Sequence, residues 1–147
     1  MNKISQFISS VFFIGYFPFA SGTFASFIAL ILWWYIPNNN VQIIIIITTI
    51  LLGKNFSNLI EKKLNIKDPS FIVIDEFAGM FISLMLIPKY ISLYILGFIL
   101  FRFFDIFKPF YIDTVQKYRY GIGVMADYIL AGIVTLFIIH LYMLFIF

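Results

Sequence analysis

The chain has no cysteine among its 147 residues and only one histidine. Disulfide bonds, thiolate metal sites and a cysteine nucleophile are therefore excluded. His140 lies deep in an apolar stretch near the end of the sequence, where a hydrogen-bonded packing role is the more common one. These absences leave the carboxylates as the main candidates for chemistry.

Charge is also scarce. Only 12% of the residues are charged and 63% are hydrophobic, whereas typical soluble domains carry about 25% charged residues. A chain of this size cannot hide so much apolar surface in its own core. The formal net charge of +3 comes from loops and forms no basic stripe, so nucleic-acid binding is not expected. We expect one membrane-embedded domain over residues 1–147.

Long apolar segments alternate with short polar breaks. The segments span about 24–36, 41–53, 71–87, 90–107 and 124–147. Only helices and closed barrels satisfy their backbone in lipid, and runs such as Ile43–Ile47 lack the alternation of a barrel strand. We predict an all-α polytopic membrane bundle of about four to five apolar helices. Only the last segment is comfortably longer than the ~20 residues that a membrane span needs. The first segment either re-enters the membrane from one side or is extended by residues 7–19. The sequence therefore leaves the number of full spans open.

The distribution of lysines predicts the orientation of the bundle in the membrane. With the breaks on alternating sides, Lys3, the 54–70 stretch and the 108–123 loop share one side, and the other side receives only Lys89. By the positive-inside rule, the lysine-rich side and the N-terminus are cytoplasmic. We expect the 54–67 stretch to continue the second helix out of the bilayer, with Glu61, Lys62 and Lys63 in water. Trp33-Trp34-Tyr35 is expected to form an aromatic belt at the opposite interface.

Four of the seven acidic residues lie inside or at the edge of the apolar segments: Asp75, Glu76, Asp105 and Asp127. A carboxylate in a lipid-facing segment costs several kcal/mol, so each is a functional-site hypothesis. In the predicted topology all four lie at the cytoplasmic ends of their helices. Side chains far apart in sequence would then converge on one face of the membrane.

Asp75 and Glu76 are adjacent, and Gly79 follows one turn later. Neighbouring residues on a helix are about 100° apart, so both carboxylates can border one crevice. A glycine lets another helix approach closely. Two oxygen donors suit Mg²⁺, which needs one or two carboxylates plus water and phosphate oxygens. The alternative is that each carboxylate pairs with a buried cation such as Arg102.

Arg102, Asp105 and Lys108 are spaced by three residues on one helix face. A self-neutralising ladder of charges is one interpretation. In the other, Asp105 binds metal or activates water, and the two cations bind phosphate. Asp127, one turn into the last helix, is the candidate for a third carboxylate ligand.

Two glycine-containing turns precede predicted helices, Ser21-Gly22-Thr23 and Gly121-Ile122-Gly123. Backbone N–H groups at a helix start can hold phosphate. A Ser or Thr helix cap, or a plain turn, is an equal alternative.

Four strings together resemble the phosphatidylglycerophosphatase A family, and their order and spacing match from about residue 15 to 135. The strings are Ser21-Gly22-Thr23, Ile72-Val73-Ile74-Asp75-Glu76-Phe77-Ala78-Gly79-Met80, Phe101-Arg102-Phe103-Phe104-Asp105-Ile106-Phe107-Lys108-Pro109 and Gly121-Ile122-Gly123-Val124-Met125-Ala126-Asp127. The second and third are specific, and the glycine-containing pieces are weak alone.

The resemblance implies a Mg²⁺-dependent lipid phosphatase of the bacterial inner membrane. It would hydrolyse phosphatidylglycerophosphate to phosphatidylglycerol, with its site facing the cytoplasm. On this basis we expect catalysis by Asp75, Glu76, Asp105 and Asp127, metal binding by Asp75, Glu76 and Asp127, and substrate binding by Gly22, Thr23, Arg102 and Lys108.

The chain departs from the family pattern at two positions. Ser21 stands where the family commonly has proline, and Tyr128 stands where it usually has a second aspartate. Two rival functions stay open. One is a phosphatase or phosphotransferase acting on another lipid phosphate. The other is a small ion or proton transporter, for which charges near the midplane and an inverted repeat are expected.

Overall fold

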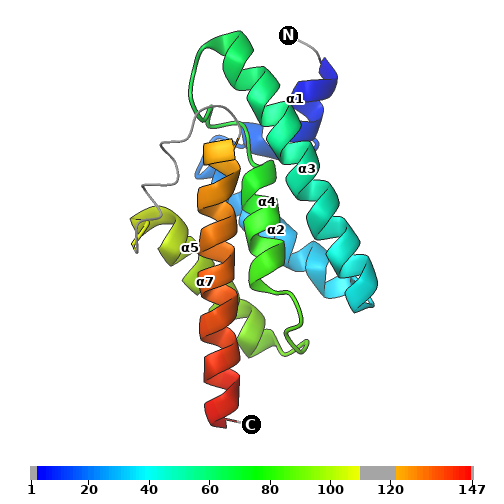
Figure 1. Cartoon of the computed structure of the whole chain (residues 1–147), viewed down its shortest axis with the longest axis vertical. Helices are drawn as coiled ribbons and strands as arrows, with labels where there is room; N and C mark the ends of the chain where they lie inside the picture. Colours follow the sequence, from blue (N-terminus) through cyan, green and yellow to red (C-terminus); the bar gives the residue numbers. More distant parts are fainter. Residues whose placement is uncertain (1–2, 110–121, 147) are drawn as a thin grey trace.

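The computed structural model describes residues 3–109 and 122–146, and within these ranges all regular structure is helical. The elements are α1 (Lys3–Ser9), the 3₁₀ turn η1 (Ile14–Tyr16), α2 (Ser21–Tyr35), α3 (Asn39–Leu64), α4 (Ile74–Ser83), α5 (Ile91–Phe107) and α7 (Ile122–Ile146). The N- and C-termini lie at opposite ends of the longest axis (Figure 1). The prediction of an all-α fold is confirmed.

The short helix α4 lies at the centre of the bundle, and all ten of its residues are buried. Helices α2, α3, α5 and α7 pack around it (Figure 1). Its contact with α7 depends on glycine: a Cβ at Gly79 would lie 2.7 Å from the Tyr128 carbonyl oxygen, and one at Gly132 would lie 2.6 Å from the Gly79 carbonyl oxygen. The helix is shorter than the predicted 71–87 segment. At about 1.5 Å per residue it is only ~15 Å long.

Among the described residues, two helices are long and apolar enough to cross a membrane, α3 and the Met125–Ile146 part of α7. Helix α2 is apolar but shorter, at 15 residues. The sequence predicts a comfortable span length only for the last segment, because the second apolar stretch ends at about residue 53. The expected continuation of the second helix is confirmed, since α3 runs on to Leu64.

Residues 7–19 do not extend α2. The chain takes left-handed φ angles of 45–67° at Val11, Phe12 and Phe13, and again 45° at Ala20, immediately before α2. A left-handed residue interrupts a right-handed helix. The segment before α2 therefore forms separate short helical pieces.

The aromatic belt predicted at Trp33-Trp34-Tyr35 is wrong for its first member. Trp33 is fully buried and stacks on Phe81, with ring centroids 4.9 Å apart. Its indole N–H donates to the Leu84 carbonyl oxygen at 3.1 Å. Leu84 directly follows α4, where helix carbonyls lack an intrahelical partner. The indole therefore supplies a hydrogen-bond donor to a carbonyl group at the end of the central helix. Of the three aromatic residues, only Tyr35 is strongly exposed.

Candidate active site

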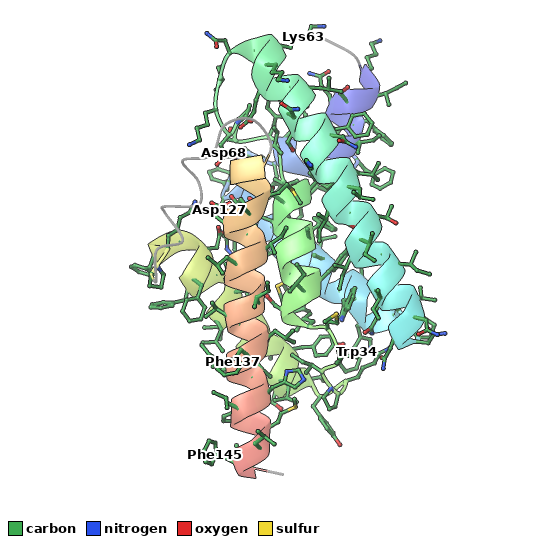
Figure 2. The ribbon with its side chains drawn as sticks, in the orientation of Figure 1. Trp34, Lys63, Asp68, Asp127, Phe137 and Phe145 are labelled. Atoms are coloured by element: carbon green, nitrogen blue, oxygen red, sulfur yellow. The ribbon has the colours of Figure 1, made fainter. Side chains whose placement is uncertain are left out.

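A polar pocket of about 330 Å³ lies where the start of α2, the loop before α4, and helices α4, α5 and α7 meet. Its lining residues are Ala20, Ser21, Gly22, Thr23, Asp68, Ser70, Ile72, Glu76, Arg102, Asp105 and Tyr128. Figure 2 shows Asp68 and Asp127 at the same end of the bundle as Lys63, with Phe145 at the other end. The structure thus brings together five of the predicted site residues, Gly22, Thr23, Glu76, Arg102 and Asp105, in one cavity.

Glu76 lies in the first turn of α4, and its side chain reaches the start of α2. A Cβ at Gly22 would lie closer to the Glu76 Oε1 atom than van der Waals contact allows, so glycine lets the start of α2 approach this carboxylate without displacing its side chain. The Tyr128 hydroxyl lies 3.5 Å from the same oxygen. The other oxygen, Oε2, is buried and has no hydrogen-bond partner among the described residues.

Asp75 is fully buried next to Glu76 but does not line the pocket. Its Oδ1 accepts a hydrogen bond from the Glu76 backbone N–H at 3.0 Å. Its Oδ2 is buried without a partner in the described part of the chain. Neither carboxylate forms an ion pair with Arg102 there, so the alternative of two structural ion pairs is not observed.

Arg102 forms its ion pair with Asp105, one turn further along α5. The first step of the predicted charge ladder is therefore present. The Arg102 Nε atom is buried without a partner within residues 3–109 and 122–146. A Cβ built on Gly22 would lie 3.5 Å from an Arg102 terminal nitrogen, so the guanidinium also faces the start of α2. Its remaining N–H groups can donate to a phosphate.

Lys108 does not continue the ladder. Helix α5 ends at Phe107, and Lys108 takes a left-handed φ of 44°. Its Nζ lies 2.6 Å from Asp127 Oδ2 and 5.7 Å from the centroid of the Tyr128 ring. Asp127 is 1% exposed and also accepts the Tyr128 backbone N–H at 3.0 Å. This ion pair lies beside the pocket and is not part of its lining.

The predicted three-carboxylate metal set is not assembled. Within the described ranges, no three Asp, Glu or His side chains come close enough together to hold one metal ion. Asp127 is paired with Lys108, which leaves Asp75 and Glu76 with one unpartnered oxygen each. Two carboxylates meet the requirement of Mg²⁺ when water and phosphate supply its other ligands. The donor set therefore fits Mg²⁺ through these two residues.

Asp68 lines the pocket, although nothing in the sequence marks it as a site residue within the lysine-rich 54–70 loop. Burial raises the pKa of its carboxyl from 3.8 to about 6; the negative charge of Asp127 also raises it, and Lys108 opposes this. Its backbone N–H donates to Glu61 Oε1 at 2.8 Å, and its φ is 51°. No periodic pattern marks this position, because it belongs to a turn rather than to a helix.

The start of α2 has no side-chain cap. Helix α2 has Ala20 at its N-cap position without a side-chain cap, and the Ser21 hydroxyl donates to the Ser70 carbonyl oxygen at 2.9 Å. That bond joins the start of α2 to the loop before α4. Gly123 lies within the first turn of α7, and Gly121 lies outside the described residues.

Comparison with known proteins supplies an independent measure of relationship. The family model described as phosphatidylglycerophosphatase A matches residues 7–143. A Bacteroides thetaiotaomicron protein named "Putative phosphatidylinositol-3-phosphatase" is 32% identical over 135 residues, covering 85% of this chain and 84% of that protein. No solved structure matches the chain.

Two relatives carry the family name. The phosphatidylglycerophosphatase A of Haemophilus influenzae is 41% identical over 93 residues, which cover 60% of this chain and 56% of that protein. The phosphatidylglycerophosphatase A of Escherichia coli is 30% identical over 130 residues, which cover 86% of this chain and 76% of that protein. The chain belongs to the phosphatidylglycerophosphatase A family.

Proposed function

We propose that this chain is a Mg²⁺-dependent membrane enzyme that hydrolyses the terminal phosphate of phosphatidylglycerophosphate and releases phosphatidylglycerol. The observation that carries the proposal is the polar pocket itself. It joins a buried carboxylate with an unpartnered oxygen, an arginine and the start of a helix. Family membership supports the class of reaction, and the relatives from Haemophilus influenzae and Escherichia coli bear the name of this activity.

The side chains divide into two roles. Arg102 and the backbone N–H groups at Gly22 and Thr23 would bind the substrate phosphate, since a helix start and a guanidinium both favour anions. Asp105, held by Arg102, would orient the attacking water. Water is the simplest nucleophile because the chain has no cysteine and the pocket lining contains no histidine.

Asp75 and Glu76 would hold Mg²⁺. When bound, the ion supplies Lewis-acid polarisation of the phosphoryl oxygens and offsets charge on the leaving oxygen. Asp127 would be a third ligand only when its carboxylate is free of Lys108. Lys108, whose ammonium group lies next to the pocket residue Tyr128, would then add a positive charge for the phosphates.

We further propose that residues 1–147 form a single domain in the bacterial inner membrane, with about four to five embedded apolar helices. The N-terminus and the polar end would face the cytoplasm. The distribution of labelled residues in Figure 2 supports this, since Lys63 lies toward the same end as Asp68 and Asp127, away from Phe137 and Phe145. A phospholipid made at the cytoplasmic leaflet would then meet the pocket directly.

The test is phosphate release from phosphatidylglycerophosphate by the purified protein in detergent micelles, with Mg²⁺ and with a chelator. We expect release with Mg²⁺ only, and at least about a 100-fold loss in Asp75→Asn, because a bound metal supplies several kcal/mol of transition-state stabilisation. The matched control is Ser83→Ala at the other end of α4, which should keep its activity. No release from this lipid, or release that Asp75→Asn leaves unchanged, would overturn the proposal.

A second candidate is hydrolysis of another lipid phosphate. The specific observation behind it is the Bacteroides thetaiotaomicron relative, which bears a phosphatidylinositol-3-phosphatase name and aligns over 85% of this chain. The same assay with phosphatidylinositol 3-phosphate separates the two. Faster release from this lipid than from phosphatidylglycerophosphate would favour the second candidate. An ion transporter is less well supported, because the described charged groups of the site gather toward one end of the bundle.

A further inference from the structure

An apolar groove lies directly beside the polar pocket, between the segment that precedes α2, helix α2 itself and α5. Its volume is about 330 Å³, and its lining residues are Phe17, Phe19, Ala20, Thr23, Phe24, Phe27 and Phe98. Ala20 and Thr23 also line the polar pocket. The two cavities therefore share a boundary at the first turn of α2.

The groove is built from phenylalanine rings held in defined contacts. Phe17 stacks on Phe24 with ring centroids 4.2 Å apart, and Phe27 meets Phe98 of α5 edge-on at 6.1 Å. The left-handed turn at Ala20 brings the preceding segment back against α2. Phe17 and Phe27 are 42% and 49% exposed, so their rings remain open to a ligand.

We infer that this groove binds one acyl chain of the lipid phosphate whose headgroup occupies the polar pocket. The inference rests on the proposed function. Such a lipid carries a phosphate-bearing head covalently joined to a hydrocarbon tail, so its two parts need adjoining polar and apolar sites. The shared residues Ala20 and Thr23 place the two sites next to each other.

Position distinguishes the groove from an ordinary lipid-facing surface. Phe137 and Phe145 on α7 are also exposed, at 63% and 89%, and Figure 2 shows both of them away from Asp68 and Asp127. Contact with bulk lipid requires only an apolar surface. A substrate tail requires an apolar surface that begins where the phosphate site ends, and the Phe17–Phe27 region meets that condition.

The first experiment is photocrosslinking, because it does not depend on turnover. The purified protein in detergent micelles is irradiated with phosphatidic acid that carries a diazirine on one acyl chain, and the labelled peptides are identified by mass spectrometry. We expect the label on residues 17–27 and around Phe98, and competition by unlabelled phosphatidylglycerophosphate. Equal labelling of α7 around Phe137, without competition, would show bulk lipid contact and overturn the inference.

The second experiment compares two exposed phenylalanines. Phe27→Ser removes an aromatic wall of the groove, whereas Phe137→Ser removes a comparably exposed ring on α7. We expect Phe27→Ser to reduce groove labelling and to raise KM for a long-chain substrate about fivefold, equivalent to ~1 kcal/mol, with kcat unchanged. Phe137→Ser should leave both unchanged, and equal effects of the two variants would contradict the inference.

The outcomes separate this inference from the proposed function. Groove labelling that lipid phosphates compete away, without phosphate release from phosphatidylglycerophosphate, would overturn the proposed substrate and support the groove. Phosphate release without groove labelling would support the substrate and overturn the groove. Absence of both release and labelling would overturn both.

Discussion

The two ends of the central helix α4 have opposite chemistry. At its N-terminal end, Asp75 and Glu76 each keep a buried oxygen without a partner among the described residues. At its C-terminal end, the Trp33 indole satisfies the Leu84 carbonyl and stacks on Phe81. Both ends are buried to a similar degree. The difference is therefore in how far the polar groups are satisfied, not in access to solvent.

This difference indicates what each end contributes. Buried polar groups without partners lower the stability of a fold, and such groups often mark functional sites. A satisfied hydrogen bond within aromatic packing stabilises the fold and offers nothing to a ligand. We therefore expect substitutions at the N-terminal end to change activity more than stability, and substitutions at the C-terminal end to do the reverse.

The largest expected effect is on catalysis at the N-terminal end. Glu76→Gln keeps the shape of the side chain and removes its negative charge, so we expect kcat/KM to fall at least about 100-fold, since metal-based stabilisation is worth several kcal/mol. The melting temperature in detergent should stay the same or rise, because a buried charge is gone. A variant that loses activity only because it melts earlier would remove the distinction between the two ends.

The corresponding substitution at the C-terminal end of α4 is Trp33→Phe. It leaves the Leu84 carbonyl without the donor it has now, and a buried unsatisfied group costs about 1–3 kcal/mol. We expect a lower melting temperature, with kcat/KM within about twofold of the wild type once the assay is run well below the transition. A selective loss of activity in the folded variant would contradict this assignment.

The third prediction compares two glycines at which an added Cβ would meet different kinds of atom. A Cβ at Gly79 would meet the Tyr128 carbonyl oxygen at 2.7 Å, whereas one at Gly97 would meet the flexible ends of Leu84 and Ile139 at 2.8 and 3.2 Å. We expect Gly79→Ala to cost about 1–3 kcal/mol by overpacking. Gly97→Ala should cost less, because side-chain ends move more easily than backbone. Thermal unfolding of both variants checks the order, and a greater loss in Gly97→Ala would reverse it.

The fourth prediction concerns pH. The folded-state pKa of Asp68 is raised from 3.8 to about 6, so the folded protein takes up this proton at a higher pH than the unfolded chain does. The contribution of Asp68 therefore favours folding below pH 4 and is lost as pH rises through about 6. We expect Asp68→Asn to melt higher than the wild type at pH 7.5, with the gap closing toward pH 4. Parallel melting curves for the two proteins across this window would contradict the shift.

The sequence was sufficient for the helical fold and for the approximate positions of the buried acids. Both the length of an apolar stretch and the presence of a charged residue within it can be read from neighbouring residues in the chain. It was not sufficient for the partners of those charges. A spacing of three residues assigned Lys108 to the α5 ladder, but the helix ends one residue earlier and a left-handed turn leads Lys108 to Asp127. The burial of Trp33 and the place of Asp68 in the pocket were not predicted for the same reason, since both positions depend on turns and long-range contacts.

The smallest expected effect comes from Tyr128, the residue that departs from the family pattern. Its hydroxyl lies 3.5 Å from Glu76 Oε1, a long contact, and a neutral hydrogen bond contributes about 0.5–1.5 kcal/mol at its usual length. We expect Tyr128→Phe to lower kcat about two- to threefold and to leave the Mg²⁺ concentration for half-maximal activity unchanged. Tyr128→Asp, with a carboxylate near Glu76, should lower that concentration instead. If Tyr128→Phe lost activity as completely as Glu76→Gln, the phenol would belong to the chemistry, and the polar end of α4 would depend on a hydroxyl as well as on its carboxylates.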